Sequence, residues 1–154
     1  MMQRLAEHLY AISITLWVGA LWAIGYLAAP TLFHVLGDRA LAGRVAGEMF
    51  GYVAWIGMAA AAYLLVFIAL RKNAGAFRSL VFWLVLLMLL LTVAGYFGVQ
   101  PIMAQLKADS LPREVMESAL RDRFAAWHGV SSVIYLVQSL LGLMLVTVQS
   151  RGLR

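Results

Sequence analysis

The sequence predicts an all-α protein, a polytopic membrane protein whose four transmembrane helices form an antiparallel bundle, with an amphipathic surface helix between spans three and four. Of the 154 residues, 64% are hydrophobic and 12% are charged, whereas soluble domains are about 45–50% apolar. Four stretches hold no Asp, Glu, Lys or Arg, namely residues 9–37, 49–70, 79–106 and 124–150. Each is longer than the roughly 20 helical residues that cross a hydrocarbon core. We therefore expect one domain over 1–154, with spans at about 9–35, 51–70, 79–103 and 124–149.

The charge balance and the lack of cysteine narrow the functional classes. The net charge of +5 comes from short loops beside the membrane, where Lys and Arg set orientation and meet anionic lipid. The partner it indicates is the lipid bilayer and not nucleic acid. The chain has no Cys, which excludes disulfides, thiolate metal sites and Cys catalysis. The first apolar run is too long for a signal-peptide core, so span one is expected to be retained.

Span one carries an aromatic face, and the segment after it carries a glycine pattern. The face follows steps of three and four residues, through Thr15, Gly19, Trp22, Tyr26, Pro30 and Phe33. It predicts either helix packing or the wall of a ligand pocket. Residues 36–50 are expected to be a short polar link with helical pattern. Small residues four apart permit close helix contact, so we expect packing within the bundle, a homo-oligomer or a membrane partner through Gly43, Gly47 and Gly51.

Spans two and three are expected to form a hairpin, because the 71–78 link is short. The second half of span three differs from its lipid-like first half, with Thr92, Gly95, Tyr96 and Gln100 on one side. The polar residues 104–123 have apolar positions at helical spacing, and Ser110 and Pro112 mark a helix start. They predict an amphipathic helix at the membrane surface.

Span four carries the strongest functional signal, a polar stripe along one helix face. The stripe consists of His128, Ser131, Ser132, Tyr135, Gln138, Ser139 and Gly142. In hydrocarbon such a stripe must turn inward. We therefore expect His128 to point into the bundle, and Tyr135 and Gln138 to face spans one and three. The predicted ligand-binding residues are Thr15, Trp22, Tyr26, Thr92, Tyr96, His128, Ser131, Tyr135 and Gln138.

The histidines suggest a second kind of site. With alternating spans, His34 and His128 fall on the same side, where Asp38 and Met103 could join them. Imidazole with carboxylate or thioether suits a transition metal, which makes His34, Asp38 and His128 a candidate metal set. A haem would use His128 as its axial ligand. Alternatively, His128 is neutral, bonds a backbone or Ser group, and fixes the entry of span four.

Several classes of activity are disfavoured. No charged side chain lies inside a span, although pumps and charge-gated channels generally need one. No phosphate-binding loop, HExxH motif or Ser–His–Asp order is present, so an enzyme is not expected. Three hypotheses remain: a binding or transport-associated protein, a structural or accessory subunit, and a haem- or metal-binding redox protein using His128.

The basic residues also predict an orientation. Both termini and the 71–78 link share one side, and each side carries six basic residues. The set on the other side is matched by six acids and lies mostly in amphipathic helix. This pattern favours a bacterial inner-membrane protein with both termini in the cytoplasm.

Four short motifs resemble a known family: WVGALW at 17–22, APTLF at 29–33, AGRVAGEMF at 42–50 and FAAWHGVSS at 124–132. They resemble the bacterial proteins called domain of unknown function 4149, which are similar to eukaryotic transmembrane protein 205. The resemblance covers nearly the whole chain and implies a four-helix membrane protein without an assigned activity. The eukaryotic relative is associated with platinum-drug resistance and membrane trafficking, which implies transport or metal handling. His34 is outside the pattern, whose positions here are Pro30, Phe33, Gly47, Phe124, His128, Gly129 and Ser131.

Overall fold

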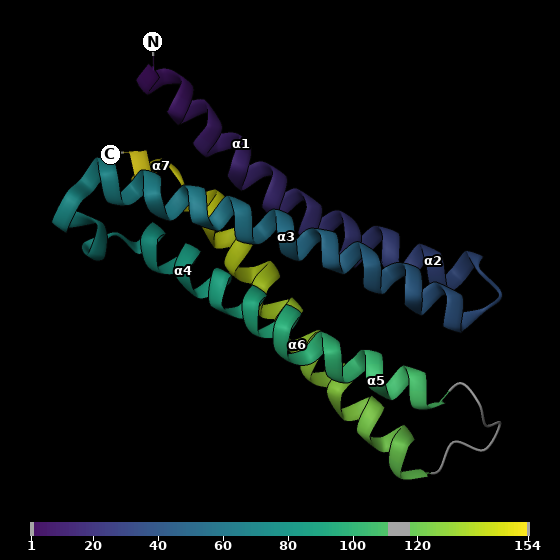
Figure 1. The fold of residues 1–154 in the computed structure, drawn as a ribbon. Coiled ribbons are helices and arrows are strands. Elements are labelled where there is room, and N and C mark those ends of the chain that lie inside the picture. Colours follow the sequence, from purple (N-terminus) through teal and green to yellow (C-terminus); the bar gives the residue numbers. More distant parts are fainter. Residues whose placement is uncertain (1, 111–117, 154) are drawn as a thin grey trace.

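The computed structural model describes residues 2–110 and 118–153, and nearly all of them are helical. Four helical segments are long and apolar enough to cross a membrane: Gln3–Val35, Arg39–Arg78, Leu80–Leu106 and Asp122–Val148. This confirms the all-helical class and the four predicted spans. Figure 1 shows successive segments running in opposite directions, with both ends of the chain at one end of the molecule. We call this the terminal end.

The first two spans are joined by a turn of only three residues. Span one comprises α1 (Met2–Trp22), the π-helical η1 (Ala23–Ala28) and α2 (Ala29–Val35). Asp38 then caps α3 (Arg39–Lys72), because its Oδ1 accepts from the N–H groups of Ala40 at 2.8 Å and Leu41 at 3.1 Å. Such a cap stabilises a helix by about 1 kcal/mol. The helical pattern predicted for the 36–50 link is therefore present from Arg39 onward, but these residues join span two in one 34-residue helix and do not form a separate link.

The second half of the chain repeats the up-and-down course. Asn73 ends α3 with a positive φ of 48°, a sign of φ that is several-fold enriched for Asn among non-glycine residues. The remaining elements are η2 (Asn73–Arg78), α4 (Leu80–Val93), the π-helical η3 (Ala94–Val99), α5 (Gln100–Ser110), α6 (Ser118–Val148) and α7 (Ser150–Leu153). The predicted surface helix over 104–123 includes residues 111–117, which lie outside the described residues. On either side of them, α5 continues span three and α6 continues into span four.

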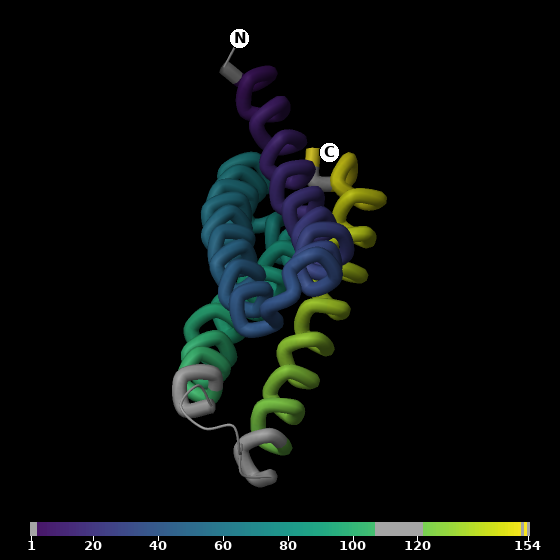
Figure 2. Tube along the Cα trace, turned by 90° about the vertical axis from the view of Figure 1, so that its right-hand side faces the viewer, coloured from purple at the N-terminus to yellow at the C-terminus, as the bar shows by residue number. Residues whose placement is uncertain are grey.

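The helices close into a ring at the terminal end and part at the other. Helix α1 packs against α3 and α6, and α4 packs against the same two helices. Figures 1 and 2 both show that the chain then divides into two helix pairs, which diverge toward the ends that carry α2 and α5. We call α1–α2 with α3 the first pair, and α4–α5 with α6 the second pair.

The hydrophobic core explains this shape. Its buried members lie within residues 10–18 and 60–88, with Leu145 added from α6. All of them belong to the half of their span that lies toward the terminal end. Trp17, Leu64 and Met88 are among the largest fully buried side chains. The four helices are therefore packed together up to about the middle of the bundle, and beyond that point contacts lie mostly within each pair.

Candidate functional site

A layer of polar side chains lies where the two pairs begin to part. Trp22, Thr92 and Gln138 each stand within about one residue of the middle of a charge-free stretch, in 9–37, 79–106 and 124–150 respectively. Charges mark where a span leaves the hydrocarbon, so these three residues lie near the bilayer midplane. Polar groups at that depth need partners inside the protein.

Gln138 is the centre of this layer. It is only 6% exposed, and its Nε2 donates to the carbonyl oxygen of Met88 at 3.2 Å and to Thr92 Oγ1 at 2.6 Å. The Thr92 hydroxyl in turn donates to the same Met88 carbonyl at 2.8 Å. The other amide atom, Gln138 Oε1, is buried and has no hydrogen-bond partner among the described residues. Leaving a buried acceptor unpaired costs about 1–3 kcal/mol, so this atom can gain from a donor.

Tyr135 joins the two pairs one helical turn farther out. Its hydroxyl donates to the Leu21 carbonyl of span one. Its ring meets Tyr26 edge-on at a centroid distance of 6.2 Å and Phe50 at 5.1 Å. The inward orientations predicted for Tyr135 and Gln138 are therefore confirmed, toward spans one and three respectively.

Gly25 makes room for the Tyr135 ring. A Cβ at position 25 would lie 2.6 Å from the tyrosine hydroxyl oxygen, which is closer than any side chain tolerates. Neither Gly25 nor Phe50 was among the predicted site residues. Gly25 stands three positions after Trp22 and fits the helical step, but the predicted aromatic face continues through Tyr26 instead. No local signal identifies the ring that faces it.

Spans one and three each contain a π-helical segment near the level at which the two helix pairs diverge. The first, η1, carries Gly25 and Tyr26, and the second, η3, carries Tyr96. π-helical turns are rare and occur frequently at functional sites. Immediately before η1, the Trp22 indole donates to the Ser139 carbonyl at 3.4 Å, which ties span one to span four. The irregular backbone therefore coincides with the polar layer.

Not every predicted residue joins this layer. Tyr96 accepts a hydrogen bond of 3.1 Å from Trp55 Nε1, so it contacts span two. Thr15 is exposed, and its hydroxyl donates to the Ala11 carbonyl of its own helix. The structure groups Trp22, Tyr26, Thr92, Tyr135 and Gln138 around one level of the bundle, with Ser139 beside them.

The outer part of the stripe departs from the prediction. His128 is exposed, and its ring stacks on Phe124 of its own helix with centroids 6.0 Å apart. The expected inward position of His128 is therefore wrong. Helix α6 begins at the end of the molecule where the two helix pairs have diverged (Figure 1). Ser131, one turn nearer the middle, is half-buried.

The predicted metal set is not assembled. Among residues 2–110 and 118–153, no three His, Asp or Glu side chains form a group that could hold a metal ion. Asp38 instead uses its carboxylate to cap α3, and His34 is exposed in the last turn of α2. The helix cap accounts for the aspartate that sequence reasoning placed with the histidines.

The glycine line makes ordinary contacts within the chain. A Cβ at Gly51 would lie 3.8 Å from both Tyr96 and Gln100, and one at Gly47 would meet nothing within 4 Å. The Gly47 carbonyl accepts from Gln100 Nε2 at 3.1 Å, so this part of α3 lies against span three. A contact with a second protomer through Gly43, Gly47 and Gly51 stays a prediction.

These features define a class: a polytopic helical membrane protein with a polar layer near its middle and helix pairs that part on one side of it. A family model described as domain of unknown function (DUF4149) matches residues 12–112, and the chain belongs to this family. The comparisons with curated proteins and with solved structures gave no match. The matched range includes Trp22, Tyr26 and Thr92 but ends before α6, which supplies Tyr135 and Gln138.

Proposed function

We propose that this protein is a membrane-embedded, transport-associated binding protein, which takes a small uncharged amphiphile from the bilayer between its two helix pairs. The observation that carries this proposal is the unpartnered Gln138 Oε1, buried at the level where the pairs part. A hydrogen-bond donor on the ligand would satisfy that oxygen. The apolar body of the ligand would then lie toward the open side.

The surrounding side chains favour a neutral ligand with a donor group. Residues 9–37, 79–106 and 124–150 contain no Asp, Glu, Lys or Arg, so an ion at this depth would find no opposite charge. An amide oxygen accepts and cannot donate, which selects a hydroxyl or N–H over an ether or ester. Tyr26, 55% exposed beside Tyr135, offers an aromatic wall to the apolar part.

Any movement of such a ligand across the membrane would be driven by the concentration gradient of the ligand. The sequence has no phosphate-binding loop for ATP and no charged residue inside a span for proton coupling. A divergent pair of helices can instead admit an amphiphile sideways from one leaflet. This supports binding, or transfer to a partner, over active pumping.

The test compares two probes on the unaltered protein. A photoreactive long-chain alcohol should label residues around α6 more than its methyl ether does, because only the alcohol can donate to Gln138 Oε1. One interior hydrogen bond in a membrane protein is worth about 0.6 kcal/mol, so we expect about threefold more labelling, measured by mass spectrometry of the labelled peptides.

Two variants extend this test. Gln138→Leu should abolish the difference between alcohol and ether. Ser132→Ala should preserve it, since the Ser132 hydroxyl bonds only the His128 carbonyl of its own helix. Equal labelling of the unaltered protein by both probes would rule out the proposed donor site.

A second candidate function, that of a structural or accessory subunit, is favoured by a different observation. The donors of Trp22, Tyr135 and Gln138 all bond the backbone of a neighbouring helix, which is what helix packing alone would require. On this alternative, neither probe labels the polar layer, and Gln138→Leu lowers only the melting temperature. A haem or metal role for His128 has less support, because that side chain is exposed and stacked on Phe124.

We also propose an orientation, with both termini in the cytoplasm of a bacterial cell. Five described cations stand at the terminal end, with Glu7 as the one described acid there: Arg4, Arg71, Lys72, Arg78 and Arg151. Lys and Arg in short loops favour the cytoplasmic side. A fluorescent protein fused to the C-terminus should therefore be bright, and alkaline phosphatase fused there should be inactive. The reverse pattern would exclude this orientation.

A further inference from the structure

A groove between the first turns of α1 and the last turns of α3 is separate from the polar layer. Its lining consists of Gln3, Ala6, Phe67, Leu70 and Arg71, and its volume is about 270 Å³. Three of these side chains are apolar, and the only charged one is a guanidinium. The groove thus combines a hydrocarbon surface with a cationic end.

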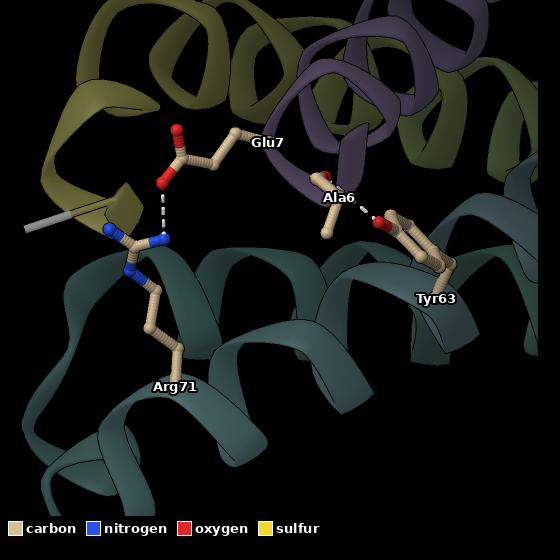
Figure 3. Close-up of polar contacts among 4 residues, drawn as sticks. All are labelled: Ala6, Glu7, Tyr63 and Arg71. Carbon is tan, nitrogen blue, oxygen red and sulfur yellow. Dashed lines mark hydrogen bonds and ion pairs between the residues drawn. The ribbon is translucent and has the colours of Figure 1, made fainter. Parts of the chain in front are cut away.

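Two polar contacts hold the walls of the groove together (Figure 3). The Tyr63 hydroxyl donates to the Ala6 carbonyl at 2.9 Å, and Arg71 Nη1 contacts Glu7 Oε1 at 2.6 Å. The Arg71 guanidinium also lies 5.9 Å from the centre of the Phe67 ring, within the range of a cation–π contact. Arg71 is therefore fixed at the groove and is still partly exposed.

Arg71 has more N–H donors than its contact with Glu7 uses. A guanidinium carries five N–H donors in a planar fork that matches carboxylate and phosphate groups. The contact with Glu7 uses Nη1, and Figure 3 shows the other terminal nitrogen turned away from that carboxylate. Lys72, the next residue, adds a second cation at this end of α3, with its Nζ donating to the Arg151 carbonyl at 2.8 Å.

The depth of the groove fits a phospholipid. Arg71 is the first charged residue after the charge-free stretch 49–70, so it stands at the level of lipid phosphates. Leu70 beside it is 76% exposed, which offers a surface to an acyl chain. A free phosphate ion would use the cation but not this apolar wall.

We propose that the groove binds one anionic phospholipid, with the headgroup phosphate against Arg71 and an acyl chain along Leu70 and Phe67. Charge complementarity selects this occupant, since five described cations face a single described acid at this end. A zwitterionic lipid would bring its own cation beside Arg71 and Lys72 and would gain less. The site does not depend on the ligand proposed for the polar layer.

The experiment measures lipid retention by native mass spectrometry. Protein in detergent is titrated with phosphatidylglycerol or with phosphatidylcholine of the same chains. One interfacial Lys or Arg contributes about 1 kcal/mol to anionic lipid binding, so the unaltered protein should prefer phosphatidylglycerol, and Arg71→Gln should reduce that preference about fivefold. Arg39→Gln, which removes a cation at the opposite end of α3, should leave the preference unchanged.

A second variant separates lipid binding from the structural role of the ion pair. Glu7→Gln also breaks the contact with Arg71 but frees the guanidinium, so it should keep or raise the preference. An equal loss in Glu7→Gln and Arg71→Gln would assign the effect to helix packing and overturn the proposal. No preference for phosphatidylglycerol in the unaltered protein, or displacement of the lipid by inorganic phosphate alone, would overturn it as well.

Discussion

Gly57→Leu is expected to destabilise the bundle by about 3 kcal/mol, because it forces a side chain into a filled core. A Cβ at position 57 would lie 2.9 Å from Cε2 of Trp17. Trp17 is only 1% exposed and is packed within the core cluster, so its indole has no free space into which to move. The measurement is the thermal midpoint of unfolding in detergent, followed by size-exclusion chromatography.

A matched control and a double variant identify the cause. Gly19→Leu makes the same chemical change in α1, where a Cβ meets nothing within 4 Å, and it should leave the midpoint nearly unchanged. The double variant Trp17→Ala with Gly57→Leu should lose less stability than the sum of the two single losses, because contacting residues are not additive. If Gly57→Leu and Gly19→Leu melt alike, the contact between α1 and α3 is not the close one described above.

Gly25→Leu should have the second-largest effect, and it should act on the site as well as on the fold. Its side chain would take the place of the Tyr135 ring, which must then leave Phe50 and the Leu21 carbonyl. We expect a loss of about 2 kcal/mol in unfolding free energy. Labelling by the long-chain alcohol should also change, because the Tyr135 ring lies about one helical turn from Gln138.

Tyr135→Phe is the informative comparison for Gly25→Leu. It removes only the hydroxyl, so it should cost about 0.6 kcal/mol and leave the ring between Tyr26 and Phe50. A loss in Tyr135→Phe as large as that in Gly25→Leu would show that the hydrogen bond, and not the packing of the ring, holds the pairs at this level. Unchanged melting in Gly25→Leu would show that Tyr135 can turn aside freely.

The four spans could be predicted from the sequence because a bilayer imposes a simple rule on composition. Charged side chains are costly in hydrocarbon, so the charge-free stretches mark the spans. The same cost predicted that Tyr135 and Gln138 turn inward, and both do. Helical periodicity and the cost of desolvation depend on the residues of one helix alone, so a span and its inward face can be predicted from local sequence.

The incorrect predictions concern residues whose surroundings depend on the helix opposite them. His128 continues the polar stripe, but its ring is exposed and rests on Phe124 of its own helix. Gly25 and Gly57 have no distinctive spacing, and only the rings of Tyr135 and Trp17 opposite them make a side chain impossible. The more regular line through Gly47 makes looser contacts. Positions that tolerate only glycine are set by the arrangement of helices, which no local pattern reports.

The start of the helix that contains span two could not be predicted, for another reason. Arg39, Arg44 and Glu48 suggested a polar link, yet these residues are compatible with helix and Asp38 caps the chain directly before them. At 1.5 Å per residue, the 34 residues of α3 extend over about 51 Å, well beyond a hydrocarbon core of about 30 Å. Charge predicts where a span leaves the lipid and does not predict where its helix ends.

Because the first and last spans contact each other, the bundle cannot close until the chain is almost completely synthesised. Tyr10 donates to the Gln149 carbonyl at 3.0 Å across 139 positions of sequence, and Leu145 fills the core beside Trp17. The first three spans are synthesised before span four, so the nascent protein lacks one of its four packed helices. During that interval Thr92 lacks Gln138, and the Trp22 indole lacks its carbonyl partner. A chain that stalls before α6 therefore lacks the helix that closes the ring.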